Sequence, residues 1–417
     1  MVKERKQSFA NSSVILFFIM MVGNAFNYFF QIVMGRLLST AEYGTLNTLL
    51  SVLTVAGTPS LIIASVSAAF TTKHIARGEQ DKLSAVFHYT LKLATACAAA
   101  IFLVGFIFSG FFCSLLDIEC TPLLIAILAA AVTCITPAFS GALQGAKRFA
   151  EYGLQGDIVA FVKLAGGVVL VLCGIRVVGP VLSSACGSVA ALLFSAYCLR
   201  GAHIFEPGGS LDAAEISEIK RFASKAMLIQ IISTVLQNGD VLIIKAYTSA
   251  EQAGVYSSGA VIAKIALYVS GAVTAVLYPL VGEASERRED TRPLLSRALL
   301  YGAGPAVLYC IVLNLFGNKL IGLFFGERYL AAADLLLPTC ALVLSVTLLV
   351  IELNYFLALN RTHLFAATVL FGCAVIVVLV SVLQPPVPQM LYTMSSVLAL
   401  VFLVNLLAAY KRKDAAA

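Results

Sequence analysis

The chain has 417 residues, of which 60% are hydrophobic and only 12% are charged, and its mean hydropathy is +0.94. Such a composition excludes an ordinary soluble domain, which is about half apolar and a quarter charged. A bilayer accommodates it, because each membrane span needs about 20 mainly apolar residues, and about twelve spans with short loops use the whole length. The composition therefore predicts an all-α integral membrane protein with no room for a soluble catalytic domain.

Hydrophobic runs predict twelve spans. In chain order they lie near residues 12–35, 44–70, 85–113, 122–144, 152–174, 178–199, 221–247, 255–281, 294–316, 333–358, 364–384 and 389–410. Four prolines fall inside these runs: Pro59, Pro137, Pro305 and Pro338. Because proline removes a backbone donor and clashes with the preceding turn, these positions predict kinks or unwound segments.

The distribution of lysine and arginine predicts the orientation in the membrane. Of the 28 basic residues, 20 fall in the two tails and in alternate loops, 5 face the opposite side, and 3 lie within spans. Under the positive-inside rule, the richer side is cytoplasmic. We therefore expect both termini in the cytoplasm and an even number of spans. The basic excess is a topology signal and does not indicate nucleic-acid binding.

The longest predicted cytoplasmic connection lies near the middle of the chain, with six spans on each side. This placement predicts two lobes of parallel orientation, 1–200 and 221–417, joined by a linker at 201–220. A short echo supports an internal repeat. Residues 40–44 after the first span resemble residues 249–254 after the seventh, if one inserted residue is allowed.

Two spans carry stripes of polar side chains at helical spacing. On the first span they are Asn24, Asn27, Tyr28 and Gln31. On the seventh they are Gln230, Ser233, Thr234, Gln237 and Asp240. Amides facing lipid would leave donors and acceptors unpaired, so both faces should point at protein or water. Two interpretations stay open: a water-filled cavity shared by the two halves, or interhelical hydrogen bonds that hold the bundle together.

Six ionisable residues lie in the interior of the predicted spans, away from their ends: Lys92, Asp157, Lys163, Asp240, Lys264 and Glu352. An isolated charge at the bilayer centre costs at least about 2.5–3.5 kcal/mol, so these groups must be paired or solvated. Asp240 and Lys264 lie on adjacent spans at similar depth, and we expect them to approach each other. Asp157 and Lys163 are six residues apart on one helix and should not pair directly. For the three lysines, anion binding and structural ion pairing both stay open.

Several catalytic signatures do not occur in the sequence. It has no G-x-x-x-x-G-K-[ST] phosphate loop, no H-E-x-x-H motif, no metal-spaced His/Cys cluster and no recognisable Ser/His/Asp set. We therefore expect neither an enzyme nor a resident cofactor or metal. Energy, if needed, would come from an ion gradient or from the gradient of the substrate, and Asp157, Asp240 and Glu352 are the candidate ion-coupling residues.

A set of short segments between residues 23 and 335 is similar to a known family. They are Gly23-Asn24-Ala25-Phe26-Asn27-Tyr28, Gly35-Arg36-Leu37-Leu38-Ser39, Glu42-Tyr43-Gly44, Asp240 with Gly254-Val255-Tyr256 and Pro279, and Leu323-Phe324-Phe325-Gly326-Glu327-Arg328-Tyr329-Leu330. Together they resemble the bacterial polysaccharide-biosynthesis flippases. These proteins form the O-antigen and capsule branch of the multidrug/oligosaccharidyl-lipid/polysaccharide exporter superfamily.

The resemblance implies two six-helix lobes around a central cavity in the bacterial inner membrane. It implies alternating access that moves a polyprenyl-pyrophosphate-linked oligosaccharide to the outer leaflet, with coupling to H⁺ or Na⁺. Ammonium groups bind compact polyanions as point charges, so the resemblance makes Lys92, Lys163 and Lys264 candidate pyrophosphate ligands. The polar side chains Asn24, Asn27, Tyr28, Gln31 and Gln237 would line the glycan path. Membrane lipid, a polysaccharide polymerase and glycosyltransferases are the implied partners.

A cation-coupled exporter of drugs or metabolites from the same superfamily is the alternative. Drug-exporting members usually carry acidic cation sites in the first lobe, where this first span has amides and Asp157 is the clearest carboxylate. A membrane polymerase or ligase would need a large outer catalytic loop, and the longest predicted outer connection, 317–332, is too short.

Overall fold

The computed structural model describes residues 2–200, 204–205, 209–287, 289–359 and 361–411. Within the helices, the side chains of some residues are not described: 2–17, 80, 225, 268–272, 275–276, 278–279, 286 and 411. All regular structure in these ranges is helical. In chain order the helices are α1 (Val2–Leu37), α2 (Thr40–Ala56), α3 (Thr58–Arg77), α4 (Gln80–Ile107), α5 (Ser109–Leu116), α6 (Cys120–Thr133), α7 (Thr136–Gly145), α8 (Phe149–Leu172), α9 (Val178–Leu199), α10 (Ala213–Tyr247), α11 (Ala250–Ala263), α12 (Ile265–Glu286), α13 (Arg292–Phe324), the 3₁₀ helix η1 (Glu327–Ala332), α14 (Leu336–Ala358), α15 (Thr362–Leu383) and α16 (Val387–Lys411).

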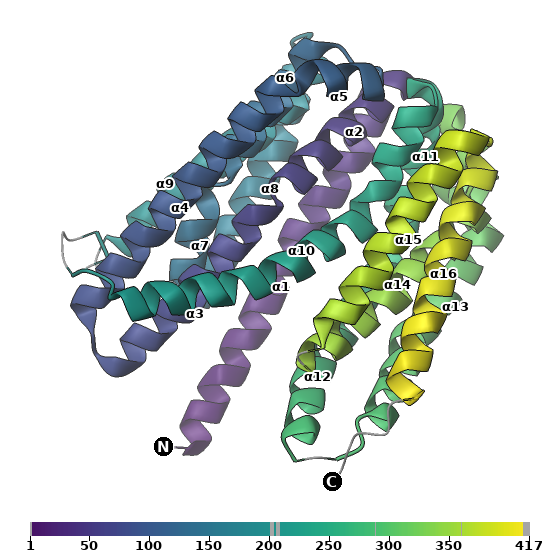
Figure 1. Ribbon diagram of the computed structural model, residues 1–417. Coiled ribbons are helices and arrows are strands. Elements are labelled where there is room, and N and C mark those ends of the chain that lie inside the picture. Colours follow the sequence, from purple (N-terminus) through teal and green to yellow (C-terminus); the bar gives the residue numbers. More distant parts are fainter. Residues whose placement is uncertain (1, 201–203, 206–208, 288, 360, 412–417) are drawn as a thin grey trace. The chain divides into compact units, whose positions relative to one another are not determined.

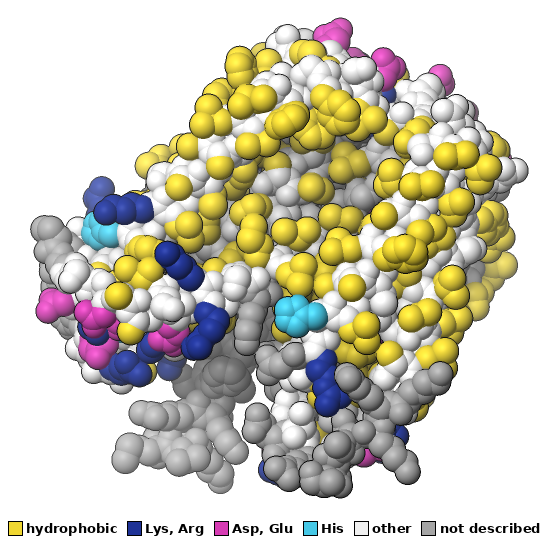
Figure 2. All heavy atoms as spheres, in the orientation of Figure 1, with side chains coloured by type: hydrophobic (Ala, Val, Ile, Leu, Met, Phe, Trp, Pro, Cys, Tyr) yellow, Lys and Arg dark blue, Asp and Glu magenta, His cyan; other side chains and the backbone are white. Residues whose placement is uncertain are grey.

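The helices match the predicted spans. Among the described residues, ten helices are long and apolar enough to cross a membrane, and the bent pair α2 and α3 makes an eleventh span. The pair α11 and α12 covers the predicted span 255–281. Figure 2 shows apolar side chains over the middles of the helices and charged side chains gathered near their ends. The prediction of a multi-pass all-α membrane protein is confirmed.

Some spans are broken into two helices, and two of these breaks lie at predicted prolines. Pro59 lies in the first turn of α3, which is bent by 43° from α2. Pro137 similarly opens α7 after α6 ends. At Pro305 the chain stays helical within α13, and Pro338 lies in the first turn of α14, where its missing N–H has no intrahelical partner to lose. The break between α11 and α12 has no proline and was not predicted.

Packing divides the chain into two compact units, residues 1–231 (the first unit) and residues 232–417 (the second unit). The boundary falls inside α10, which begins in the first unit and ends in the second. The predicted linker 201–220 includes residues 201–203 and 206–208, which lie outside the described residues. Its last part is already helical from Ala213 onward, because α10 starts there. The lobe boundaries inferred from sequence stay a prediction.

In the first unit, small residues allow close helix packing. The helix α8 packs against α9 and α1, and α3 packs against α7 and α4. A Cβ atom on Gly187 of α9 would lie 2.8 Å from the Val159 carbonyl oxygen of α8. Across the α3–α7 contact, the Ser67 hydroxyl donates to the Ala138 carbonyl at 2.8 Å. Membrane helices commonly associate through small residues and side-chain hydrogen bonds of this kind.

The first part of α10 is amphipathic and belongs to the first unit. Ile219, Ala223 and Ala226 recur at i, i+4 and i+7 and pack against Val66 and Phe70 of α3. Figure 1 shows this part of α10 crossing beside α3. The start of the helix that leads into the second unit is therefore held on the first unit by its apolar face.

In the second unit, α14 is the most enclosed of the apolar helices. It packs against α16, α12 and α13, and 72% of its most apolar stretch is buried. The Ser345 hydroxyl of α14 hydrogen-bonds to Ser395 of α16 across this packing. Polar groups on such a helix have no access to water unless the protein provides it.

The echo between the two halves is a shared structural motif. Ser39 caps α2 by accepting from the Glu42 N–H at 3.2 Å, and the Glu42 carboxylate accepts from the Ser39 N–H at 2.7 Å. Ser249 and Gln252 form the same capping box at the start of α11, at 3.2 and 3.3 Å. Ser39 is therefore equivalent to Ser249 and Glu42 to Gln252. These equivalences align the two segments without an insertion. The sequence-based alignment of residues 40–44 with 249–254, which allowed one inserted residue, was therefore wrong.

Candidate functional site

A polar pocket of about 360 Å³ lies within the first unit, among α1, α7, α8, α9 and the end of α6. Its polar side chains are Asn24, Asn27, Thr133, Thr136, Ser140, Tyr152, Gln155, Asp157 and Ser188. Three of the residues predicted from sequence, Asn24, Asn27 and Asp157, therefore meet in one place. Amides, hydroxyls and one carboxylate in this arrangement can coordinate a cation or hydrogen-bond a hydroxylated ligand.

The carboxylate of Asp157 lies directly against the backbone of α1. It is hydrogen-bonded to the backbone of Gly23, and a Cβ atom on residue 23 would overlap its oxygen. Glycine at position 23 thus lets α1 and α8 approach closely enough to bring the carboxylate beside the amides of α1. Gly156, which also lines the pocket, has open space around the corresponding position.

Lys163 lies one to two turns further along α8 and contacts α1 separately. Its ammonium donates to the Asn27 Oδ1 atom at 2.5 Å and lies 4.6 Å from the centroid of the Phe30 ring. The Asn27 Nδ2 atom donates to the Gly23 carbonyl at 3.1 Å. Asp157 and Lys163 have different partners, as predicted, and Asn27 connects their surroundings.

The rest of the first-span stripe does not line the pocket. Gln31 accepts a hydrogen bond from the Tyr43 hydroxyl of α2 at 3.0 Å, so it serves an interhelical contact. Tyr28 is half-buried and lies outside the pocket lining. Lys92 is exposed on α4 and is also outside the lining. Of the three amides predicted on the first span, Asn24 and Asn27 therefore line the pocket, and Gln31 instead hydrogen-bonds to α2.

A second polar site lies in the second unit, where Asp240 of α10 meets Lys264. The Lys264 ammonium is 2.9 Å from Asp240 Oδ1 and 2.8 Å from Oδ2, and it donates to the Gln237 carbonyl at 2.8 Å. The Tyr256 hydroxyl of α11 donates to Asp240 Oδ2. The Asp240 side chain is only 6% exposed and Lys264 is 23% exposed. The predicted approach of Asp240 and Lys264 is confirmed.

The helix break positions Lys264. This residue ends α11 and precedes α12, so its side chain leaves the chain at the junction of the two helices. Gln237 supplies its backbone carbonyl, while its side-chain amide donates to the Ser233 hydroxyl at 2.9 Å. Tyr256 was missed as a site residue, and its only signal in the sequence was its place in the family segment Gly254-Val255-Tyr256.

Glu352 is isolated on α14. Its side chain is fully buried, and neither carboxylate oxygen has a hydrogen-bond partner among the described residues. An unpaired ionised carboxylate is very costly in an apolar environment. This position can therefore hold a neutral acid, or a carboxylate only if a cation enters with it.

Comparisons with known proteins agree with this architecture. A family model described as "Polysaccharide biosynthesis protein" matches residues 33–334. No curated protein gives a significant sequence match. Among solved structures, an inward-facing multidrug resistance MATE family transporter of the MOP superfamily is 14% identical with a TM-score of 0.77, covering 97% of this chain and 99% of that chain.

Two further solved structures are similar over nearly the whole chain. The lipid II flippase MurJ in an inward closed conformation is 12% identical with a TM-score of 0.70, covering 97% of this chain and 88% of that chain. A MOP superfamily transporter from Pyrococcus furiosus is 15% identical with a TM-score of 0.66, covering 96% and 95%. At these identities the similarity shows the fold alone.

Proposed function

Because the chain belongs to the polysaccharide biosynthesis protein family and has the fold of MOP superfamily transporters, we propose that it flips a lipid-linked oligosaccharide across the membrane. The substrate would be a polyprenyl-pyrophosphate-linked unit of O-antigen, capsule or a similar polysaccharide, and the mechanism would be alternating access. The family match over residues 33–334 is the observation that carries the proposal. The chain is a transporter in this reading and catalyses no covalent step.

The physical task fits the polar groups within the membrane helices. Glycan hydroxyls cannot cross hydrocarbon without hydrogen-bond partners, so a flippase must supply a polar path while the lipid tail stays in the bilayer. The pocket of the first unit offers amide, hydroxyl and carboxylate groups among helices that are apolar enough to cross a membrane, and lipid tails offer no such groups. Asn24 and Asn27 are the polar residues that we assign to this path.

Lys163 is the lysine best suited to bind the pyrophosphate. Its ammonium contacts a neutral amide and an aromatic ring, so its charge is not balanced by a carboxylate in those contacts. An ammonium has three donors, and Lys163 can therefore add an anion without giving up a salt bridge. Lys163 does not line the pocket itself, but it contacts the lining residue Asn27. Lys264 would first have to release Asp240, and Lys92 is exposed on α4.

Three carboxylates are candidates for coupling to H⁺ or Na⁺. Asp157 shares its pocket with hydroxyl and amide oxygens, which are ligands suited to a hard cation. Asp240 would act by releasing Lys264 in one conformation of the transport cycle and binding it again in another. Glu352 would act by taking up or releasing a proton in its enclosed position on α14.

A cation-coupled exporter of drugs or metabolites is the second candidate. The observation that favours it is the half-buried carboxylate of Asp157 in a pocket large enough for a small cation. The two functions differ in the charge of the cargo, since a pyrophosphate-linked glycan is anionic and the drugs would be cationic.

We place the protein in the bacterial cytoplasmic membrane with both termini in the cytoplasm. The distribution of basic residues supports this orientation. Cys113 of α5 and Cys120, the first residue of α6, form a disulfide across the turn between these two helices. This turn follows the end of α4 that lies away from Lys82. Disulfides persist in oxidising compartments, so their position supports an outward-facing turn.

The proposal can be tested with purified protein in liposomes that contain either a lipid-linked oligosaccharide or a cationic dye. We expect translocation of the glycan lipid by the wild type, loss of that activity in Lys163→Ala, and retained activity in Lys92→Ala. Transport of the dye without movement of the glycan lipid would replace the flippase proposal with the exporter. Equal glycan translocation by both variants would remove Lys163 from the mechanism.

A further inference from the structure

A buried histidine lies at the end of α3, away from both polar sites described above. The His74 side chain is 0% exposed, and its Nδ1 atom lies 2.7 Å from the Glu79 carboxylate. Since a carboxylate only accepts, Nδ1 carries the proton in this hydrogen bond. The other ring nitrogen, Nε2, is buried and has no hydrogen-bond partner among the described residues. A buried polar atom without a partner is costly, so this nitrogen points to a missing ligand.

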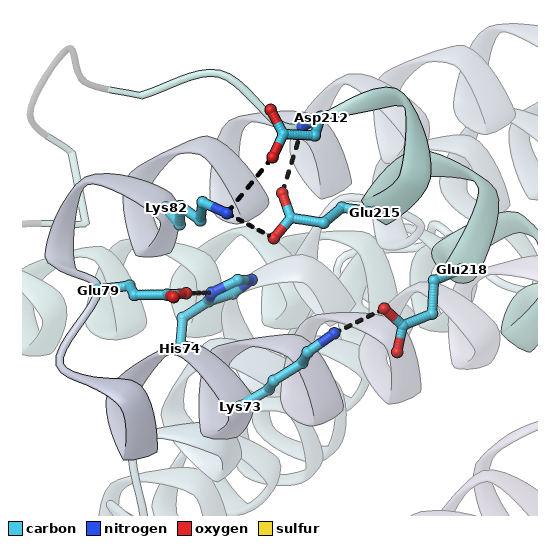
Figure 3. A network of polar contacts seen from close by, with 7 residues as sticks. All are labelled: Lys73, His74, Glu79, Lys82, Asp212, Glu215 and Glu218. Atoms are coloured by element: carbon cyan, nitrogen blue, oxygen red, sulfur yellow. Dashed lines mark hydrogen bonds and ion pairs between the residues drawn. The ribbon is translucent and has the colours of Figure 1, made fainter.

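Three elements of the first unit meet at this ring. Gly78 ends α3 in the left-handed conformation (φ 72°), which turns the chain and brings Glu79 back onto His74. Glu215 comes from the first turn of α10 and is 9% exposed. Figure 3 shows the imidazole between the carboxylates of Glu79 and Glu215. One ligand atom from each of the three residues lies within 4.8 Å of the others.

We propose that His74 and Glu215 bind a divalent transition-metal ion of the Zn²⁺ class, with Glu79 orienting the imidazole. An imidazole nitrogen and a carboxylate oxygen bind Zn²⁺ at about 2.0–2.2 Å, so side-chain movements would bring the ligand atoms of His74 and Glu215 from their present spacing onto one ion. In carboxylate–histidine–metal sites, a carboxylate accepts from the ring nitrogen that does not bind the metal. Glu79 already has this position, which leaves Nε2 and Glu215 as direct ligands and water for the remaining positions.

Lys82 competes for the same carboxylate. Its ammonium lies 2.9 Å from the Glu215 Oε1 atom and 3.6 Å from the Asp212 Oδ2 atom. In the absence of metal this ammonium supplies the positive charge that the carboxylates need. Metal binding therefore displaces a cation that is already present, and the affinity depends on how easily Lys82 leaves.

The ion would fasten the start of α10 onto the turn between α3 and α4. Two ion pairs, Lys82–Glu215 and Lys73–Glu218, already connect these elements, the second at 2.6 Å. A metal would add a third connection beside the apolar contact of Ile219. The site could not be seen in the sequence, because Glu215 is 136 residues away from Glu79 and no His/Cys spacing marks it.

The test uses the full-length protein without an affinity tag, freed of metal and held in detergent. Zn²⁺ alone is added, and bound metal is measured by equilibrium dialysis with elemental analysis, while Co²⁺ replaces Zn²⁺ for visible spectroscopy. We expect one ion per chain that excess Mg²⁺ does not displace, because Mg²⁺ prefers all-oxygen octahedral sites. His74→Gln and Glu215→Gln should each weaken binding by at least about tenfold, and Glu79→Gln by about tenfold to a hundredfold.

Two further variants make the result decisive. Lys82→Met removes the competing ammonium and should strengthen binding, by about tenfold on the scale of other outer-shell changes. His88→Gln changes an exposed histidine of the neighbouring helix and should bind Zn²⁺ like the wild type. Size-exclusion profiles without metal establish that each variant is folded. Binding below one ion per chain in the wild type, or equal binding in folded His74→Gln, would overturn the proposal.

Discussion

The ammonium of Lys264 contacts both carboxylate oxygens of Asp240, at 2.9 and 2.8 Å. The Tyr256 hydroxyl also donates to Asp240, and the Lys264 ammonium also donates to the Gln237 carbonyl. The pair is almost enclosed, and each charged group is satisfied by named neighbours. Enclosure makes the two residues dependent on each other, because a buried charge without its partner keeps the full cost of leaving water.

Removing Lys264 alone should therefore lower the stability of the protein much more than removing both charges of the pair. We expect Lys264→Ala to lower the free energy of unfolding by about 3–5 kcal/mol, since Asp240 would be left buried and unpaired. The double variant Asp240→Asn with Lys264→Met should recover most of this loss. Thermal unfolding in detergent, followed by circular dichroism, measures the difference. Equal stability of Lys264→Ala and the wild type would show that water solvates the Asp240 carboxylate once the ammonium is removed.

Tyr256 should contribute through its hydroxyl. Tyr256→Phe removes a donor to an ionised acceptor, and we expect a loss of about 1.5–3 kcal/mol. The matched control is Tyr309→Phe, because the Tyr309 hydroxyl donates to a neutral carbonyl, that of Ile262, at 2.9 Å. That change should cost only about 0.5–1.5 kcal/mol. The same unfolding measurement applies, and a larger loss in the control would contradict the assignment.

The spans and one of the two polar sites could be predicted from the sequence, and the contacts that could not be predicted depend on how helices pack. Spans are predictable because hydropathy acts locally, and the Asp240–Lys264 pair was predictable because depth in the membrane follows residue count along a helix. The partners of Lys163 and Asp157 were not predictable. Asn27 and Gly23 contact them only because α1 and α8 pack side by side, and helix packing depends on the shapes of both surfaces.

The close approach of Gly23 to Asp157 gives a steric prediction. Gly23→Ala places a methyl group on the carboxylate and should cost about 1–3 kcal/mol through overpacking. Gly156→Ala is the matched control in the same pocket, because nothing lies within 4 Å of the added atom. In a helix this control should be stabilising by as much as about 1 kcal/mol. A similar effect of both changes on thermal unfolding would contradict the packing of α1 on α8.

The proposed orientation gives a redox prediction. The Cα atoms of Cys113 and Cys120 are 5.5 Å apart, within the range that a disulfide spans. If the turn between α5 and α6 faces the periplasm, the bond should form in cells and disappear in a host that lacks periplasmic thiol oxidation. Mass spectrometry of peptides prepared without reductant detects the linkage. Free thiols at both positions in an oxidising host would place this turn in the cytoplasm.

Glu352 and Asp240 are both buried carboxylates, yet replacing each by its amide should change the free energy of unfolding by very different amounts. Asp240 is paired with Lys264, so Asp240→Asn leaves a buried ammonium and should cost about 3–5 kcal/mol. Glu352 has no partner among the described residues, and a neutral amide resembles the neutral acid that this position favours. We therefore expect Glu352→Gln to unfold within about 1 kcal/mol of the wild type, the usual size of one hydrogen-bond difference. In liposomes, the same variant should keep translocation of the glycan lipid but lose its response to a pH gradient. A loss of stability as large as that of Asp240→Asn would show that Glu352 is ionised and paired, and it would end the proposal that this residue takes up a proton.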